Sequence, residues 1–269
     1  MDILFARTSN FRVDADQIDC CAATRRIGIF PAKLPLIISM GGNIIMMKTI
    51  FLAGVAAFAL PVAAEAQDAN VLSAGDKLVR VRAIVVAPQD SSSGITPTFP
   101  GEHVKVSTAI TPEVDFTYMV TDNVGLELIA ATSKHTVSGK SGTTGSIGDL
   151  GSTWALPPTL TVNYHFNPKG NVRPYIGAGL NYTLFYSEKA SSGLKTAVGP
   201  TKVKLSSSFG PAAQIGVDIA AGPRGFFNVD VKWIKMDTDA TLSTTAIGTQ
   251  KVKVKLNPLV FGVGYGWRF

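Results

Sequence analysis

Two histidines, His103 and His135, are the side chains of this sequence best suited to proton transfer, and both stand near serines. A histidine beside a serine hydroxyl can support nucleophilic catalysis when a third group orients the imidazole, but no ordered triad spacing occurs here. Phosphate-loop, zinc-ligand and calcium-loop patterns do not occur either. We interpret both histidines as solvated loop residues, and predict a chain that is not an enzyme and uses no metal or cofactor.

Charged side chains of both signs recur at every second position. Examples are Arg80 with Arg82, Glu113 with Asp115, and the Asp230–Lys232 pair. Residues two apart in a β-strand point to the same side. If these segments are strands, each pair shares a face, and the chemistry favoured by opposite charges at such spacing is ion pairing.

The net charge of +6 comes from dispersed basic residues. They form no compact cluster and no aromatic stacking motif accompanies them, so we predict no nucleic-acid partner. The alternating lysines Lys251, Lys253 and Lys255 suit a phosphate-rich lipid surface instead.

Residues 47–66 have the parts of a secretory signal peptide: a basic start at Lys48, an apolar run over 50–64 and a small-residue site. The run is shorter than the roughly 20 residues that cross a bilayer as a helix. We expect cleavage between Ala66 and Gln67. Residues 1–46 are interpreted as an upstream extension, with Met46 or Met47 as the natural start, so the mature chain is 67–269. It would lack both cysteines, which excludes disulfides and thiol chemistry.

After the expected cleavage site, apolar residues alternate and do not follow a helical period. The sequence predicts strands over 76–87, 106–121, 124–136, 156–167, 172–187, 204–220, 226–240 and 250–269. Short links (122–123, 167–171, 221–225) alternate with long ones (88–105, 137–155, 188–203, 241–249). This pattern is typical of an all-β, eight-stranded antiparallel transmembrane barrel, with short periplasmic turns and longer extracellular loops, in the bacterial outer membrane.

The distribution of aromatic residues favours a membrane barrel over a soluble one, which is the alternative. In the last strand, bulky apolar residues share one face and glycines occupy most of the other. The aromatics expected at a membrane interface near the turns are Tyr118, Tyr164, Phe166, Phe227, Trp267 and Phe269. We interpret the terminal Phe269 as the contact for the outer-membrane assembly machinery.

Four stretches in order resemble the OmpW family of small outer-membrane barrels: residues 116–128, 156–166, 173–183 and 213–218. The second contains Leu156-Pro157-Pro158, and the third Arg173-Pro174-Tyr175. The resemblance covers nearly all of 67–269. It implies an eight-stranded barrel with a hydrophobic interior pocket, associated with uptake of small apolar molecules across the outer membrane.

The residues expected to face the barrel interior change character along the strands. The upper, apolar positions are Ile84, Val86, Ile129, Ala131, Phe185, Ile234, Met236, Val252, Val254 and Leu256. The lower, charged positions are Arg80, Arg82, Glu113, Asp115, Glu127, Arg173, Asp218, Asp230, Lys232 and Arg268. Unpaired charges in so narrow a space would cost several kcal/mol. We therefore expect an ion-paired floor beneath an apolar pocket for small hydrophobic solutes; the alternative is that the apolar positions pack against loops.

A pocket with a closed floor needs a side exit for transport. Pro157 and Pro158 cannot donate ladder hydrogen bonds, and Pro211 and Pro258 lie in other strands nearby. We hypothesise that the wall near Pro157 and Pro158 opens and passes solutes sideways into the bilayer. Lys232 stands where the resemblance implies an apolar residue, which argues against a fully dry pocket base.

The alternative function is a structural or surface-interaction barrel. Its loops would bind host factors, phage or lipopolysaccharide without transport. Outer-membrane lipids and lipopolysaccharide are expected partners under either hypothesis.

Overall fold

The computed structural model describes residues 70–269. The expected extension 1–46, the signal peptide 47–66 and its cleavage site at Ala66 and Gln67 lie outside the described residues. The strands are β1 (Lys77–Ala87), β2 (Ser91–Ser92), β3 (Val104–Val106), β4 (Ala109–Met119), β5 (Val124–Ala131), β6 (Ser133–Gly139), β7 (Asp149–Leu156), β8 (Thr159–His165), β9 (Val172–Ala190), β10 (Thr201–Leu205), β11 (Ser208–Ala221), β12 (Gly225–Ile234), β13 (Asp237–Thr244), β14 (Gly248–Lys255) and β15 (Leu259–Arg268). The helices are α1 (Gly142–Ile147) and α2 (Ser192–Val198).

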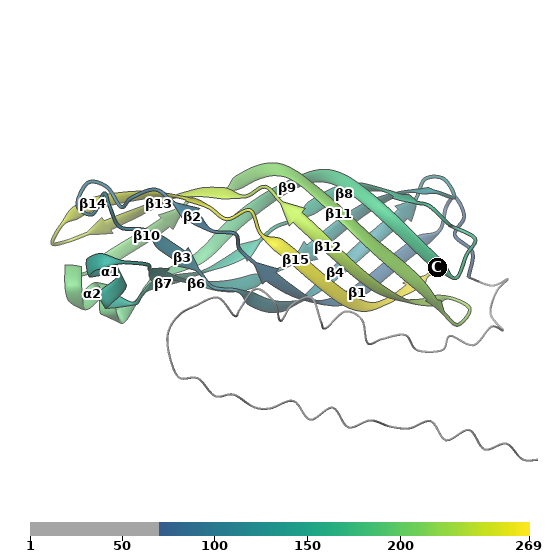
Figure 1. Cartoon of the computed structure of the whole chain (residues 1–269), viewed down its shortest axis with the longest axis horizontal. Coiled ribbons are helices and arrows are strands. Elements are labelled where there is room, and N and C mark those ends of the chain that lie inside the picture. The colour runs from purple at the N-terminus through teal and green to yellow at the C-terminus, as the bar shows by residue number, and fades with distance from the viewer. Residues whose placement is uncertain (1–69) are drawn as a thin grey trace, which may run out of the picture. The chain divides into compact units, whose positions relative to one another are not determined.

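Eight strands form a closed antiparallel barrel in the order β1-β4-β5-β8-β9-β11-β12-β15, and β15 pairs with β1 (Figure 1). The register is continuous where the ring closes, from Leu78 opposite Arg268 to Ala87 opposite Leu259. The short links follow β4, β8 and β11, where the sequence predicts them. The predicted eight-stranded architecture is therefore confirmed.

Above the barrel, the chain continues as two smaller sheets. One contains β3, β6, β7 and the upper part of β9, and the other has the order β10-β13-β14-β2. Several predicted strands are therefore interrupted. The predicted strand 250–269 is divided between β14 and β15 because Pro258 lacks an N–H and Asn257 adopts a φ of 34°.

The barrel has apolar side chains outside and charged ones inside. Val263 is 59% exposed and Val162 56%, whereas Arg80 is fully buried. The predicted lower aromatics are all exposed, from Trp267 at 42% to Phe269 at 67%. An exposed apolar belt over a charged interior is favourable only where lipid surrounds the barrel.

The two helices lie in long links, at the opposite end of the barrel from the C-terminus (Figure 1). Glu102 accepts the first N–H groups of α1 from Thr143 and Thr144, and Ser191 caps α2 by accepting from Leu194 N. Their six and seven residues are too few to give the helical period that the sequence lacks. Neither helix is long and apolar enough to cross a membrane.

The segment before β1 closes the lower, periplasmic end of the barrel. Asn70 donates to the carbonyls of Gly222 and Gly225. Leu72 is fully buried in a cluster with Leu78, Met119 and Phe226. The interior is therefore blocked below as well as at the charged floor.

Candidate functional site

Arg82 is at the centre of the charged floor. Its Nε lies 2.9 Å from Glu113 Oε1, its Nη2 2.5 Å from Asp115 Oδ2, and its Nη1 2.8 Å from Asp230 Oδ2. Its guanidinium is fully buried. The β1–β4 register explains the first two contacts, because Arg82 stands directly opposite Glu113 and diagonally across from Asp115, the register partner of Arg80.

Arg80, two residues before Arg82 on β1, is the centre of a second group of ion pairs lower in the barrel. Its Nη1 lies 3.0 Å from Glu127 Oε1 and its Nη2 3.0 Å from Asp218 Oδ2. Asn163 and Gln214 donate to Glu127 Oε2, which completes the hydrogen bonding of that carboxylate. The rings of Tyr175 and Phe226 lie 5.6 and 5.3 Å from the Arg80 guanidinium carbon. These charges are paired and hydrogen-bonded, as burial requires.

Glycines on β15 make room for this network. Gly262, Gly264 and Gly266 stand opposite Ile84, Arg82 and Arg80. A Cβ at Gly266 would lie 3.0 Å from Arg80 Cγ, and one at Gly262 would meet the Asp230 carboxylate. The small inward face of β15 is therefore what lets two long arginines cross the interior.

Lys232 forms the top of the floor. Its ammonium lies 2.7 Å from Glu113 Oε1 and 2.9 Å from Asp230 Oδ2, and the residue is only 3% exposed. Lys232 and Glu113 also line the cavity above. The base of that cavity is therefore charged but internally paired.

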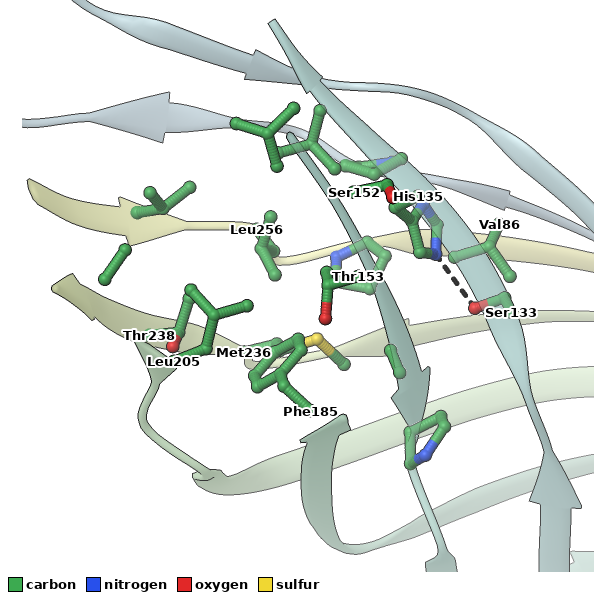
Figure 2. Close-up of a pocket in the computed structure, with 18 of the residues that line it drawn as sticks. Val86, Ser133, His135, Ser152, Thr153, Phe185, Leu205, Met236, Thr238 and Leu256 are labelled. Atoms are coloured by element: carbon green, nitrogen blue, oxygen red, sulfur yellow. Dashed lines mark hydrogen bonds between the residues drawn. The ribbon is translucent and has the colours of Figure 1, made fainter. Parts of the chain in front are cut away.

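A cavity of about 120 Å³ lies above Lys232. All ten apolar residues expected at the upper interior line it, contributed by β1, β5, β9, β12 and β14 together with the links after β12 and β14. Figure 2 shows Val86, Phe185, Met236 and Leu256 among the side chains around it. Engineered apolar cavities of about 150 Å³ stay dry and bind benzene. The size and lining suit a small apolar molecule.

Two of the charges expected in the floor lie below it. Arg268 is opposite Leu78, two positions below Arg80 in the register. Its Nη1 lies 3.3 Å from Asp76 Oδ2, and its side chain is 21% exposed. Arg173 is buried and donates to the backbone carbonyl of Asn70, so it holds the segment before β1 in place.

One wall of the cavity carries polar side chains that the sequence interpretation missed. Ser133 and His135 lie on β6, and His135 is only 6% exposed, so its interpretation as a solvated loop residue is wrong. His103 is exposed, as expected. Figure 2 shows the contact between His135 Nε2 and Ser133 Oγ, at 2.8 Å. The alternation that places Ile129 and Ala131 inward extends to 133 and 135, and this signal could have identified them.

Burial of His135 lowers its pKa, partly opposed by a hydrogen bond from its ring to the backbone of Ser107. The Nδ1 atom lies 2.8 Å from Ser107 O. The imidazole is therefore neutral at neutral pH.

The strand ladder is interrupted beside the cavity at the two predicted prolines. The β5–β8 pairing ends at Ile129 opposite Thr159, and the β6–β7 pairing begins at Ser133 opposite Ala155. Pro157 lies between these pairings and lines the cavity. On its other side β8 stays attached to β9, because Tyr182 N donates to Pro158 O.

The other two prolines have different positions. Pro258 lines the cavity, and its carbonyl accepts from Ile234 N. Pro211 lies within the β9–β11 ladder opposite Leu180, and the residue is exposed.

Comparison with known proteins matches residues 73–269 to the model of the OmpW family. The chain belongs to the OmpW family. It is 38% identical over 197 residues to outer membrane protein W of Vibrio cholerae, covering 72% of this chain and 89% of the relative. This family assignment, with the exposed apolar belt, makes the chain an outer-membrane protein.

Two proteins of Pseudomonas aeruginosa are also similar to this chain. The crystal structure of outer membrane protein OprG from Pseudomonas aeruginosa superposes with a TM-score of 0.70 and 32% identity, over 75% of this chain and 99% of that one. The dibenzothiophene metabolism operon protein PahQ of Pseudomonas aeruginosa is 31% identical over 157 residues, covering 58% of this chain and 69% of the relative. None of these three proteins is named for an enzymatic activity.

Proposed function

We propose that this OmpW-family barrel carries small apolar molecules passively across the outer membrane. The observation on which the proposal rests is the apolar cavity directly above an ion-paired floor. The floor opposes passage of water and ions along the barrel axis, while the cavity offers a solute an environment like a hydrocarbon. A barrel of eight strands is just wide enough to hold one small ligand.

The solute would leave sideways, through the wall at Pro157 and Pro158. The interruption of the β5–β8 ladder supports this route, because Ala131 at the end of β5 and Pro157 in the link between β7 and β8 both line the cavity there. Few backbone hydrogen bonds would have to break for the wall to widen there. The name of PahQ, which refers to the metabolism of an aromatic sulfur compound, is consistent with a family role near hydrophobic substrates.

The test is uptake by cells that lack the protein and carry a plasmid-borne copy. Uptake of a panel of alkanes, fatty acids and amines would be measured as the loss of each compound from the medium. We expect the wild-type copy to accelerate uptake of at least one apolar class. No difference for any apolar solute would refute the proposal.

A cavity-filling variant provides the mechanistic arm of that test. Ala131→Trp should block uptake, because Ala131 lines the cavity beside the interrupted ladder. Ala130→Trp is the matched control: the same strand and the same added volume, but an exposed residue facing away from the interior. Equal uptake by both variants would exclude the cavity as the route.

A structural or surface-interaction barrel is the second candidate. The outer face of the β10-β13-β14 sheet favours it, since Lys251, Lys253 and Lys255 are exposed there. Phosphates of lipopolysaccharide are suitable partners for such lysines. Under this function, alanine at all three lysines would weaken the outer-membrane barrier, and Ala131→Trp would have no effect.

A further inference from the structure

The cavity wall contains a hydroxyl, on Ser133, whose hydrogen-bonding direction is fixed through a histidine. A chain of hydrogen bonds runs from the backbone carbonyl of Ser107, through the ring of His135, to the hydroxyl of Ser133. Both contacts are 2.8 Å, and Ser133 and His135 are 5% and 6% exposed. Both residues also line the cavity.

The direction follows from the chemistry of the first partner. A backbone carbonyl can only accept, so Nδ1 of His135 must carry a proton and donate to Ser107 O. In a neutral imidazole, the other nitrogen then has no proton and accepts. The Ser133 hydroxyl therefore donates its proton to Nε2 of His135.

Ser133 Oγ keeps its lone pairs but has no proton to give to a ligand. At this point of the wall, a solute can donate a hydrogen bond but cannot receive one from Ser133. We propose that the preferred solutes are apolar molecules that carry a single hydrogen-bond donor, such as a phenol or an alcohol, with Ser133 as the acceptor. This inference rests on the proposed uptake function and names its substrate class.

Other hydroxyls of the lining have different partners. The Thr153 hydroxyl lies 3.2 and 3.3 Å from the carbonyls of Trp154 and Tyr186 and donates to them. Thr159 donates to Pro157 O and accepts from Asn181 Nδ2, so its partners are already supplied by the protein. Thr238 donates to Ser206 O, and its oxygen also lies 3.4 Å from Ser206 Oγ. Ser152 lines the cavity without a histidine partner to fix its proton. A hydroxyl free to rotate either donates or accepts, and so does not discriminate.

Three ligands of nearly equal size test the inference. They are 1-naphthol, which donates, 1-methoxynaphthalene, which only accepts, and 1-methylnaphthalene, which does neither. Dissociation constants would be measured by naphthalene fluorescence with the barrel in lipid nanodiscs at neutral pH, after subtracting partition into empty nanodiscs. We expect 1-naphthol to bind about fivefold more tightly than either analogue, the usual net value of one hydrogen bond.

Three variants identify the acceptor. Ser133→Ala should remove the preference for 1-naphthol and leave the affinity for 1-methylnaphthalene unchanged. Ser133→Thr, which keeps a hydroxyl, should restore the preference, and Ser152→Ala should leave it intact. If the wild type binds all three ligands equally, or if Ser133→Ala keeps the preference, the inference is wrong while the uptake proposal stands. If none of the three ligands binds, both this inference and the uptake proposal are refuted.

Discussion

At the scale of single residues, Arg82 has the most exacting environment in the barrel. Three carboxylates lie within 3 Å of its guanidinium, and no part of its side chain is exposed. Its long side chain reaches them because β15 presents glycine at the facing position, Gly264. Removing the guanidinium would leave Glu113, Asp115 and Asp230 buried with too little positive charge.

We therefore predict that Arg82→Met destabilises the barrel by about 3–5 kcal/mol, the usual cost of removing one partner of a buried ion pair. The measurement is urea unfolding of the refolded barrel in detergent micelles, followed by tryptophan fluorescence. A loss below about 1 kcal/mol would mean that the floor is hydrated and that the ion pairs contribute little.

Lys253→Met is the control for that prediction. Lys253 is 78% exposed and its Nζ lies 3.9 Å from Asp239 Oδ1. Exposed pairs of this kind contribute less than about 1 kcal/mol. The two variants remove the same charge, so the difference between them measures burial.

The sequence was sufficient to place most of these side chains. Strand alternation identifies the faces of Arg80, Arg82 and Lys232 correctly, because a residue's side of a strand depends only on its parity. It does not show which opposite charge each one meets, since that depends on register across strands. The same alternation places His135 on the inward face, but the serine-rich sequence around it favoured an exposed loop.

At the scale of elements, the important feature is that strands stop and restart at the upper edge of the barrel. Breaks occur between β5 and β6, β7 and β8, and β14 and β15. The expected strands 156–167 and 250–269 run through Pro157, Pro158 and Pro258, and the structure breaks the chain's strands at these prolines. The division of the upper strands into two sheets is not predictable from alternation, because side-chain parity continues unchanged through each of these three breaks.

Replacing Pro157 and Pro158 together with valine tests the lateral route. Valine restores two backbone donors, so the β5–β8 ladder can extend upward past Ile129 and Thr159. We expect slower uptake of apolar solutes and unchanged or higher stability. The measurement is the initial rate of uptake in the complemented cells described above.

Pro211→Val is the matched control. Pro211 lies within a paired region of β11, opposite Leu180, away from the interruption. It should leave uptake unchanged. If the double variant transports as fast as the wild type, solutes do not leave beside β8.

At the scale of the whole molecule, we propose that Phe269 is read by the outer-membrane assembly machinery. Its side chain is 67% exposed, and only its backbone takes part in the barrel, in reciprocal hydrogen bonds with Lys77. A side chain with so few contacts contributes little to stability. Its aromatic character therefore suits recognition of the chain before or during insertion.

Phe269→Ala should accordingly lower the amount of folded barrel in the outer membrane several-fold without changing its stability once folded. The first quantity is measured by heat-modified gel mobility of membrane fractions, and the second by urea unfolding after refolding in detergent. Normal levels in cells would remove Phe269 from the recognition signal. A large loss of stability would instead assign it a packing role.

The pairing of β1 with β15 has a consequence for how the molecule is made. The first barrel strand, β1, pairs with the last, β15. Any incomplete chain that folded would therefore have two unpaired sheet edges, one on β1 and one on its last strand. Open edges invite pairing with other chains, and hydrocarbon cannot satisfy their backbone groups. We therefore expect the chain to reach its membrane unfolded and the β1–β15 seam to close last.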